Sequence, residues 1–246
     1  MEVRAVGSVE EPRLQNLLEL LTALAGHEPA PINIHEITMR CEGGKIRQEI
    51  QLRHLIIPAS SDCTTTTFGA DRWAVYQYNR PPWGDLNMAK LAATVRTVTQ
   101  AYCSGPNVPN FYKGLGFVQQ YQHFKKGFAY DVQRGTWVVH ILVSRLHRVV
   151  QETTANTKSN GGALAGGGSS LSRRKEERRP GVAGEEVAPG HVLIEVWTEV
   201  DDGKTHTEAI AAIVEVGKQL AVEGVELQPL PDGKNRPRIG ALPLQR

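Results

Sequence analysis

The sequence predicts a mainly β protein of the α+β class, in which an antiparallel sheet closes, or nearly closes, into a β-barrel that carries two long helices. Apolar and polar residues alternate over most of residues 31–150 and again from residue 191, which is the pattern of half-buried strands. Turns rich in glycine, asparagine and proline separate these runs at short intervals that suit hairpins. We count roughly nine or ten strands, and a sheet of that size removes its exposed edges by curling.

The first expected elements are a short strand at residues 2–7 and a helix. Ser8 and Glu11 have the spacing of a capping box, and Pro12 suits a first helical turn. Leucines then recur at three- and four-residue steps until Gly26, at Leu14, Leu17, Leu18, Leu21 and Leu24. This apolar stripe predicts a helix that packs against the sheet.

From residue 31 to residue 150 the apolar pattern has a period of two. The expected strands contain Ile32 and Ile34, Ile50 and Leu52, Trp73 and Val75, Leu91, Ala93 and Val95, and Trp137, Val139, Ile141 and Val143. Their short connections favour an antiparallel meander over a parallel sheet with helical crossovers.

Residues 111–130 combine a helix end, a glycine stop and a strand. Gly114 and Gly116 can take the left-handed conformation that ends a short helix. Side chains alternate between the two faces of a strand. The residues expected to share one face after the stop are Phe117, Gln119, Tyr121 and His123.

Residues 151–190 interrupt the strand pattern with a glycine- and serine-rich run and a charged run, which cannot bury enough apolar surface to become ordered. A strand resumes at His191, a second helix follows the capping pair Thr205 and Glu208, and residues 225–230 can close the sheet. We therefore expect one domain at 1–230 with a disordered insertion at 151–190, followed by an extended proline-rich tail at 231–246.

The composition narrows the class of protein. A formal net charge of +2 is too small to predict a general nucleic-acid or anionic-membrane surface. Three widely spaced cysteines, Cys41, Cys63 and Cys103, show no zinc-ligand spacing and favour a reducing compartment. We find no apolar stretch long enough for a membrane span and no secretory leader, so we expect an intracellular protein without a membrane partner.

The sequence also lacks the spacing that a metal-dependent phosphohydrolase tunnel needs. Such a tunnel holds its cation with carboxylates at alternate strand positions, and no Glu-x-Glu occurs in the chain. Glu195 and Glu199 could pair as acid and base, although an outward-facing, solvated strand explains them more simply. We assign no catalytic, cofactor-binding or metal residue, and expect no cofactor and no enzyme activity.

Basic residues leave two alternatives open. The strand arginines that could line a cavity and hold phosphate are Arg40, Arg47, Arg53, Arg72 and Arg96. The run from Arg173 to Arg179 could serve nuclear import or an acidic partner, with solvated charge as the simpler explanation. Aromatic and basic residues do not interleave regularly, so no single-stranded nucleic-acid groove and no sequence-specific DNA binding are expected.

Several of these segments resemble the family of subunit 18 of the Mediator coactivator complex. The matching segments are the first strand with the helix at 13–24, His35-Glu36, Trp73 before Arg80-Pro81, Ala93 to Arg96, Phe111 to Phe117 and Lys126-Gly127-Phe128. The similarity covers most of residues 1–150 and returns at 191–230.

This resemblance implies a fold and a role. The fold would be a barrel distantly similar to RNA triphosphatase tunnels but without their metal carboxylates. The role would be a nonenzymatic, nuclear scaffold in the Mediator head module, paired with subunit 20, anchored through a C-terminal helix of subunit 8 and linked indirectly to RNA polymerase II. The alternative is a tunnel phosphohydrolase with rearranged carboxylates. The sequence does not assign the residues of the partner interface.

Overall fold

The computed structural model describes residues 1–41, 48–56, 72–79, 92–150, 182–201 and 206–230. The strands are β1 (Glu2–Glu10), β2 (Ala30–Cys41), β3 (Gln48–Leu55), β4 (Arg72–Asn79), β5 (Thr94–Ser104), β6 (Phe117–Arg134), β7 (Trp137–Val150), β8 (Val182–Glu186), β9 (His191–Glu199) and β10 (Gln228–Pro229). The α-helices are α1 (Leu14–Ala25), α2 (Val108–Gly114) and α3 (His206–Leu220), with 3-10 turns η1 (Glu11–Arg13) and η3 (Ala221–Glu223).

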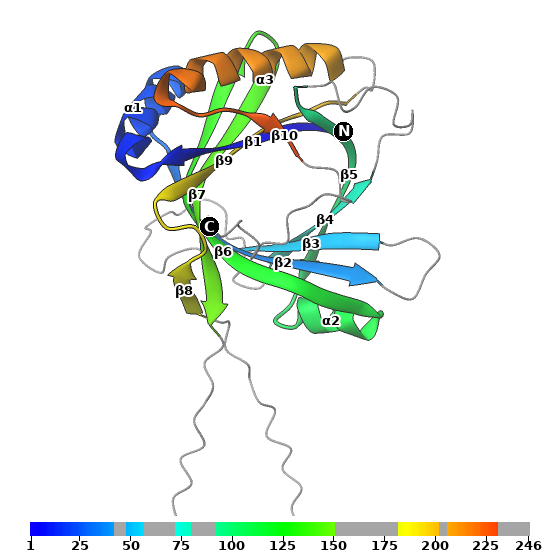
Figure 1. Ribbon diagram of the computed structural model, residues 1–246. Coiled ribbons are helices and arrows are strands. Elements are labelled where there is room, and N and C mark those ends of the chain that lie inside the picture. Colours follow the sequence, from blue (N-terminus) through cyan, green and yellow to red (C-terminus); the bar gives the residue numbers. More distant parts are fainter. Residues whose placement is uncertain (42–47, 57–71, 80–91, 151–181, 202–205, 231–246) are drawn as a thin grey trace, which may run out of the picture.

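Eight of the strands form a closed antiparallel barrel. The order is β1-β5-β4-β3-β2-β6-β7, and β9 closes the ring by pairing with both β7 and β1. The two remaining strands extend the wall, β8 along the end of β7 and β10 beside β1 (Figure 1). The predicted antiparallel barrel and its two long helices, α1 and α3, are confirmed.

The larger apolar core lies between the barrel and these two helices, which cover the same side of the wall (Figure 1). Leu17 and Leu21 of α1 are fully buried there, as the leucine stripe predicts. Each such side chain contributes about 1.5–3 kcal/mol on burial. Gly26 ends α1 in the left-handed conformation, with φ of 72°.

A smaller core lies on the outside of β2, β3 and β4, where α2 covers it. Its buried members are Ile37, Met39, Ile50, Leu52, Trp73, Val75 and Val108. Each barrel strand places apolar side chains on its outer face. The alternate side chains of the same strands therefore point to the barrel interior.

The structure corrects the start of the first helix. Ser8 is not a helix cap: it pairs with Leu193, because β1 continues to Glu10 alongside β9. The helical turn begins at Glu11, and Pro12 does occupy its first turn. The longer strand is favoured because it extends the ladder with β9.

The expected face of β6 is also wrong. Met39 of β2 pairs with Gln119, whereas Thr38 pairs with Tyr121, so the register shifts at Gln120. A one-residue bulge reverses the faces of a strand. Phe117 and Gln119 therefore share the outer side, while Tyr121 and His123 turn inward. Of the two glycine stops, Gly116 has a positive φ of 89°, and Gly114 ends α2 without one.

Two further expectations change at strand ends. β5 begins at Thr94, so Ala93 precedes it, and Leu91 lies outside the described residues. β8 lies inside the span expected to be disordered, because Val182 and Ala183 pair with Val150 and Val149. The segment 151–181, the capping residue Thr205 and the tail 231–246 lie outside the described residues.

None of the helices in the described ranges has the length and apolar character needed to cross a membrane.

Candidate functional site: a ring of buried charges inside the barrel

Seven charged side chains from six strands meet on the inner face of the barrel. They are Arg53, Glu36, Lys125, Glu195, Arg4, Glu2 and Arg96. We call this set the charge ring. In the order given, cations and carboxylates alternate, and each contacts the next.

Lys125 of β6 lies in the middle of this series and contacts the carboxylates on both sides of it. Its Nζ lies 3.3 Å from Glu36 Oε2 on β2 and donates to both oxygens of Glu195 on β9, at 2.9 and 3.1 Å. Glu36 in turn accepts a hydrogen bond of 2.9 Å from Arg53 Nε on β3. One ammonium group thus joins two strands that are not neighbours in the barrel.

The second half of the charge ring runs through β1 and β5. Arg4 donates to Glu195, and its other terminal nitrogen lies 3.5 Å from Glu2. Glu2 accepts from Arg96 Nε and Nη2, at 2.9 and 2.6 Å. Glu2, Arg4, Glu36, Lys125 and Glu195 are all buried.

Tyr78 of β4 closes the ring between its two ends. Its hydroxyl accepts from Arg53 Nη2 at 3.1 Å, and the Arg96 guanidinium lies 3.5 Å from the centre of its aromatic ring. The charge ring therefore connects β1, β2, β3, β4, β5, β6 and β9 through polar contacts across the barrel interior.

The cations hold all three carboxylates in the ionised form. Burial by itself raises the pKa of a carboxyl group, but at Glu36 the charges of Lys125 and Arg53 outweigh it and lower the pKa. Lys125 and Arg4 likewise lower the pKa of Glu195 to about 2. The pKa of Glu2 is lowered by Arg4 and Arg96 against the same effect of burial.

These shifts decide what the charge ring can do chemically. A general acid or base works best with a pKa near the working pH, and these carboxyl groups move away from it. His123, whose Nε2 lies 3.7 Å from Glu36 Oε1, has its pKa lowered by burial, so it is neutral at pH 7. The arrangement favours a fixed polar core over proton transfer.

The residues singled out from the sequence fall in different places. Glu195 is a buried member of the charge ring, so the outward, solvated explanation is wrong for it, whereas Glu199 is exposed at the end of β9. They do not form an acid and base pair, because Glu195 is engaged by Arg4 and Lys125. Glu199 is the register partner of Glu2 on β1.

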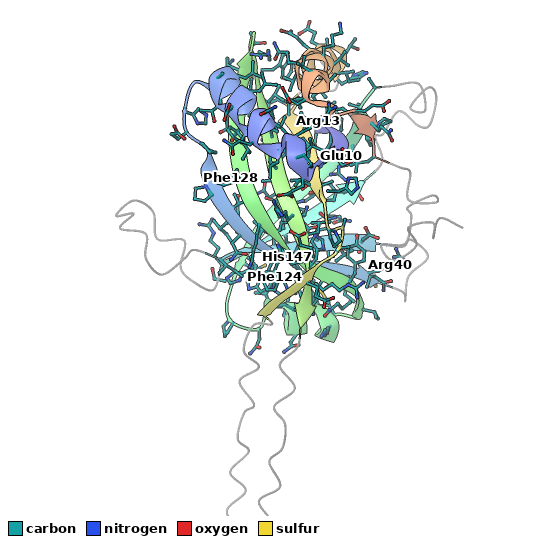
Figure 2. All side chains as sticks on the ribbon, turned by 60° about the vertical axis from the view of Figure 1, so that its left-hand side comes forward. Glu10, Arg13, Arg40, Phe124, Phe128 and His147 are labelled. Carbon is teal, nitrogen blue, oxygen red and sulfur yellow. The ribbon has the colours of Figure 1, made fainter. Side chains whose placement is uncertain are left out.

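Among the arginines, Arg53 and Arg96 belong to the charge ring, as the cavity-lining alternative requires. Arg40 instead lies near the C-terminal end of β2 (Figure 2), where it pairs with Glu49 at 3.0 Å. Arg72 lies over Tyr102, with 4.3 Å between its guanidinium carbon and the ring centre. Arg47 and the run from Arg173 to Arg179 lie outside the described residues.

Arginine and aromatic residues lie beside one another on the inner face, although they do not interleave regularly along the sequence. Arg53 lies over Tyr76 and Arg4 over Trp197, in addition to the pairs of Arg96 with Tyr78 and Arg72 with Tyr102. The partners come from different strands, so their proximity depends on strand register and leaves no local motif in the sequence.

Sequence reasoning missed Glu2, Arg4 and Lys125 as site residues, and took Glu36 only as part of a family motif. A signal was present, since charged residues alternate with fully buried apolar ones in Glu2-Val3-Arg4-Ala5. Charge at the inward positions of a strand with a buried outer face predicts a polar interior.

Metal ligation has little support among the described residues, where no three His, Cys, Asp or Glu side chains gather as a metal site would require. Lys125 lies between Glu36 and Glu195, where it supplies the positive charge that a cation would otherwise bring. Cys41 and Cys103 are free and half-buried, and Cys63 lies outside the described residues.

Solved structures share this fold. A chain of the Schizosaccharomyces pombe Mediator head module has a TM-score of 0.57 and 17% identity, over 93% of this chain and 98% of that chain. The PH1819 protein from Pyrococcus horikoshii OT3 has a TM-score of 0.51 and 14% identity, over 93% of each chain. The resemblance inferred from the sequence is thus confirmed as a likeness of fold to a Mediator head chain.

No protein-family model matches the sequence, and the comparison with curated proteins gives no match.

Proposed function

We propose that the chain is a nonenzymatic subunit of the Mediator coactivator complex. In this role it belongs to the head module in the nucleus and scaffolds protein contacts that regulate RNA polymerase II transcription. The observation that carries the proposal is the fold shared with a head-module chain over 93% of this chain and 98% of that one. Nearly full coverage of both chains indicates that the whole barrel is shared.

The charge ring supports a scaffolding role. Its carboxylates are neutralised by side chains of the same chain, and their pKa values are lowered. They therefore suit a structural role in the barrel wall better than a role in catalysis. A rigid barrel of this kind offers its outer surface and strand edges to partners. Permanent interfaces of such assemblies bury about 2,000 Å² or more.

Reconstitution tests this proposal. The chain is co-expressed with Mediator subunits 8 and 20 of the same organism, and complexes are separated by gel filtration, with a variant of subunit 8 that lacks its C-terminal helix as control. We expect a stable pair with subunit 20 and loss of subunit 8 when its helix is removed. A folded chain, verified by circular dichroism, that joins neither subunit contradicts the proposal.

A phosphohydrolase is the second candidate, because four cations from different strands gather inside the barrel. These are Arg4, Arg53, Arg96 and Lys125. Phosphate release from tripolyphosphate with Mg²⁺ or Mn²⁺ separates the two candidates. Turnover that Glu195→Gln abolishes and the exposed control Glu199→Gln leaves intact supports the hydrolase and contradicts the scaffold.

A further inference from the structure

The short connection between α1 and β2 carries a histidine whose two ring nitrogens both face carbonyl oxygens. His27 lies directly after Gly26, the left-handed residue that ends α1. Its Nδ1 lies 2.8 Å from the carbonyl oxygen of Glu28, and its Nε2 lies 3.3 Å from the carbonyl oxygen of Asp131 on β6. The second contact joins the end of α1 to a strand residue 104 positions further along the chain.

Two carbonyl acceptors decide which protonation state of His27 fits its surroundings. A carbonyl oxygen accepts hydrogen bonds and cannot donate one. The neutral imidazole has one N–H and one lone pair, so it bonds to one carbonyl and places its lone pair against the other. The imidazolium ion has an N–H at each nitrogen and donates to both. The geometry at His27 is therefore that of the cation.

The electrostatic surroundings of His27 favour the cation as well. The Glu28 carbonyl raises the pKa of His27, and the carbonyl and carboxylate of Asp131 add to this effect against a small loss of solvation. The last turn of α1 contains no basic residue. A positive charge at position 27 therefore also complements the negative end of the helix dipole.

The charged groups around His27 come from β6, β7 and the connection itself. The Asp131 carboxylate on β6 is shared with His140 on β7, whose Nδ1 lies 2.7 Å from it. The Glu28 side chain is exposed and contacts His27 through its backbone carbonyl. His27 is exposed too, so solvent exchanges protons with it directly.

We propose that His27 is a pH-sensitive clasp, which ties the end of α1 to β6 when its ring is protonated and releases β6 when the ring loses a proton. The contact with Glu28 is the shorter of the two, so the remaining proton stays on Nδ1. The lone pair of Nε2 then faces the Asp131 carbonyl, and the hydrogen bond between α1 and β6 is lost.

The direction of the pH dependence follows from this arrangement. The pKa of His27 is higher in the folded chain than in the unfolded chain. The clasp therefore contributes fully below a pH of about 6.5 and is lost as the pH rises through the folded-state pKa. His35, whose pKa is lowered by burial, changes the stability of the whole fold in the opposite direction.

Two measurements on the full chain test the proposal. NMR follows the ring resonances of His27 between pH 5 and 9, and we expect a midpoint above about 6.5. Amide hydrogen exchange gives protection factors for the end of α1, where the Gly26 N–H donates to Thr22. Protection of residues 24–27 should fall at least about twofold between pH 5.5 and 8, the scale of one hydrogen bond.

His27→Gln keeps a polar side chain and removes the titration, so protection of residues 24–27 should no longer fall as the pH rises. His191→Gln, at an exposed histidine on β9, is the matched control and should behave like the unmodified chain. A His27 midpoint at or below about 6.5, protection that stays constant or rises, or an unchanged response in His27→Gln overturns the proposal. The clasp involves contacts within one chain, so these outcomes are independent of assembly with other subunits.

Discussion

Lys125 joins two carboxylates in the barrel interior. Its ammonium group neutralises two buried carboxylates from strands on either side of β6, at 3.3 Å from Glu36 and 2.9 Å from Glu195. Buried ion pairs contribute little net stability compared with apolar packing, but a buried charge without its partner is strongly destabilising. Position 125 is therefore far more sensitive to substitution than its exposed neighbour.

Lys125→Met should lower the free energy of unfolding by about 3 kcal/mol or more, because Glu36 and Glu195 stay buried with less compensating charge. Urea denaturation at pH 7 measures this loss. Lys126→Met is the matched control, since Lys126 is adjacent and exposed, and should change stability by less than about 0.5 kcal/mol.

A double-mutant cycle then tests the coupling. Adding Glu195→Gln to Lys125→Met removes one of the two carboxylates that have lost the Lys125 charge, so the double variant should be at least about 1 kcal/mol more stable than additivity predicts. Strict additivity of the two substitutions shows that the two groups do not interact.

Protonation of His35 should make the free energy of unfolding depend on pH. The His35 ring stacks on Phe124 with 4.7 Å between ring centres, and burial lowers its pKa from 6.5 to about 4. The unfolded chain binds a proton between these values and the folded chain does not. Folding stability should therefore fall as pH decreases from about 6.5 to 4, by about 3 kcal/mol from this group.

The variant His35→Phe keeps an aromatic ring beside Phe124 and removes the titration. Its stability, followed by thermal unfolding between pH 6.5 and 5, should depend less on pH than that of the unmodified chain. His191→Gln, at an exposed histidine, is the control and should keep the original slope. If both variants show the original slope, His35 is not the group responsible.

At the scale of elements, Gly127 fixes how closely β6 and β7 approach. It pairs with Ser144, and a Cβ at position 127 would come within 1.9 Å of the Val143 carbonyl oxygen. This carbonyl oxygen belongs to backbone in the middle of a ladder, so the two strands cannot move apart without breaking hydrogen bonds. This gives a physical reason for a glycine inside an otherwise regular strand.

Gly127→Ala should lower the free energy of unfolding by about 3 kcal/mol or more, as expected for overpacking against backbone. Chemical denaturation measures it, with Gly114→Ala as the control, because an added Cβ at position 114 meets no atom within 4 Å. Equal stability of the two variants means that β6 and β7 separate more easily than their ladder indicates.

Element types were predictable from sequence wherever one period extended far enough. The leucine stripe predicts α1, and the alternation at Trp137 to Val143 predicts β7. The boundaries of the elements could not be predicted from sequence, because distant partners decide them. β9 keeps Ser8 in a strand, and β2 accommodates the bulge at Gln120. β8 was missed because its short, partly acidic sequence becomes a strand only against the end of β7.

For the molecule as a whole, closure of the barrel creates the charge ring, and no local motif in the sequence shows which of its charges meet. Its members Glu2 and Arg4 lie on β1, whereas their partners Arg96 and Glu195 are far along the chain. The sequence shows each residue as an unremarkable charge in an alternating strand. Which charges meet depends on the strand order and register of the complete barrel.

Closure of the barrel also determines which parts of the chain the fold requires. β9 completes the ring by pairing with β7 at His140 to Ser144 and with β1 along its whole length. β8 adds to the end of β7, where Arg145 Nη1 donates to Glu186 at 3.1 Å. Val150 and Val182 are register partners, so the segment between them joins two neighbouring strand ends.

Deleting residues 155–178 should therefore preserve the barrel, because a short connection is enough to join Val150 to Val182. Loop-closure entropy predicts a gain of about 1 kcal/mol for a loop roughly four times shorter. Extending the deletion to residue 188 removes β8 and Glu186, which is one of the two carboxylate partners of Arg145, and should lower the melting temperature relative to the shorter deletion. Differential scanning calorimetry compares the three chains, and assembly with subunit 20 provides the functional measurement. If the shorter deletion unfolds the protein or abolishes assembly, residues 155–178 take part in the fold or the interface and are not a dispensable insertion.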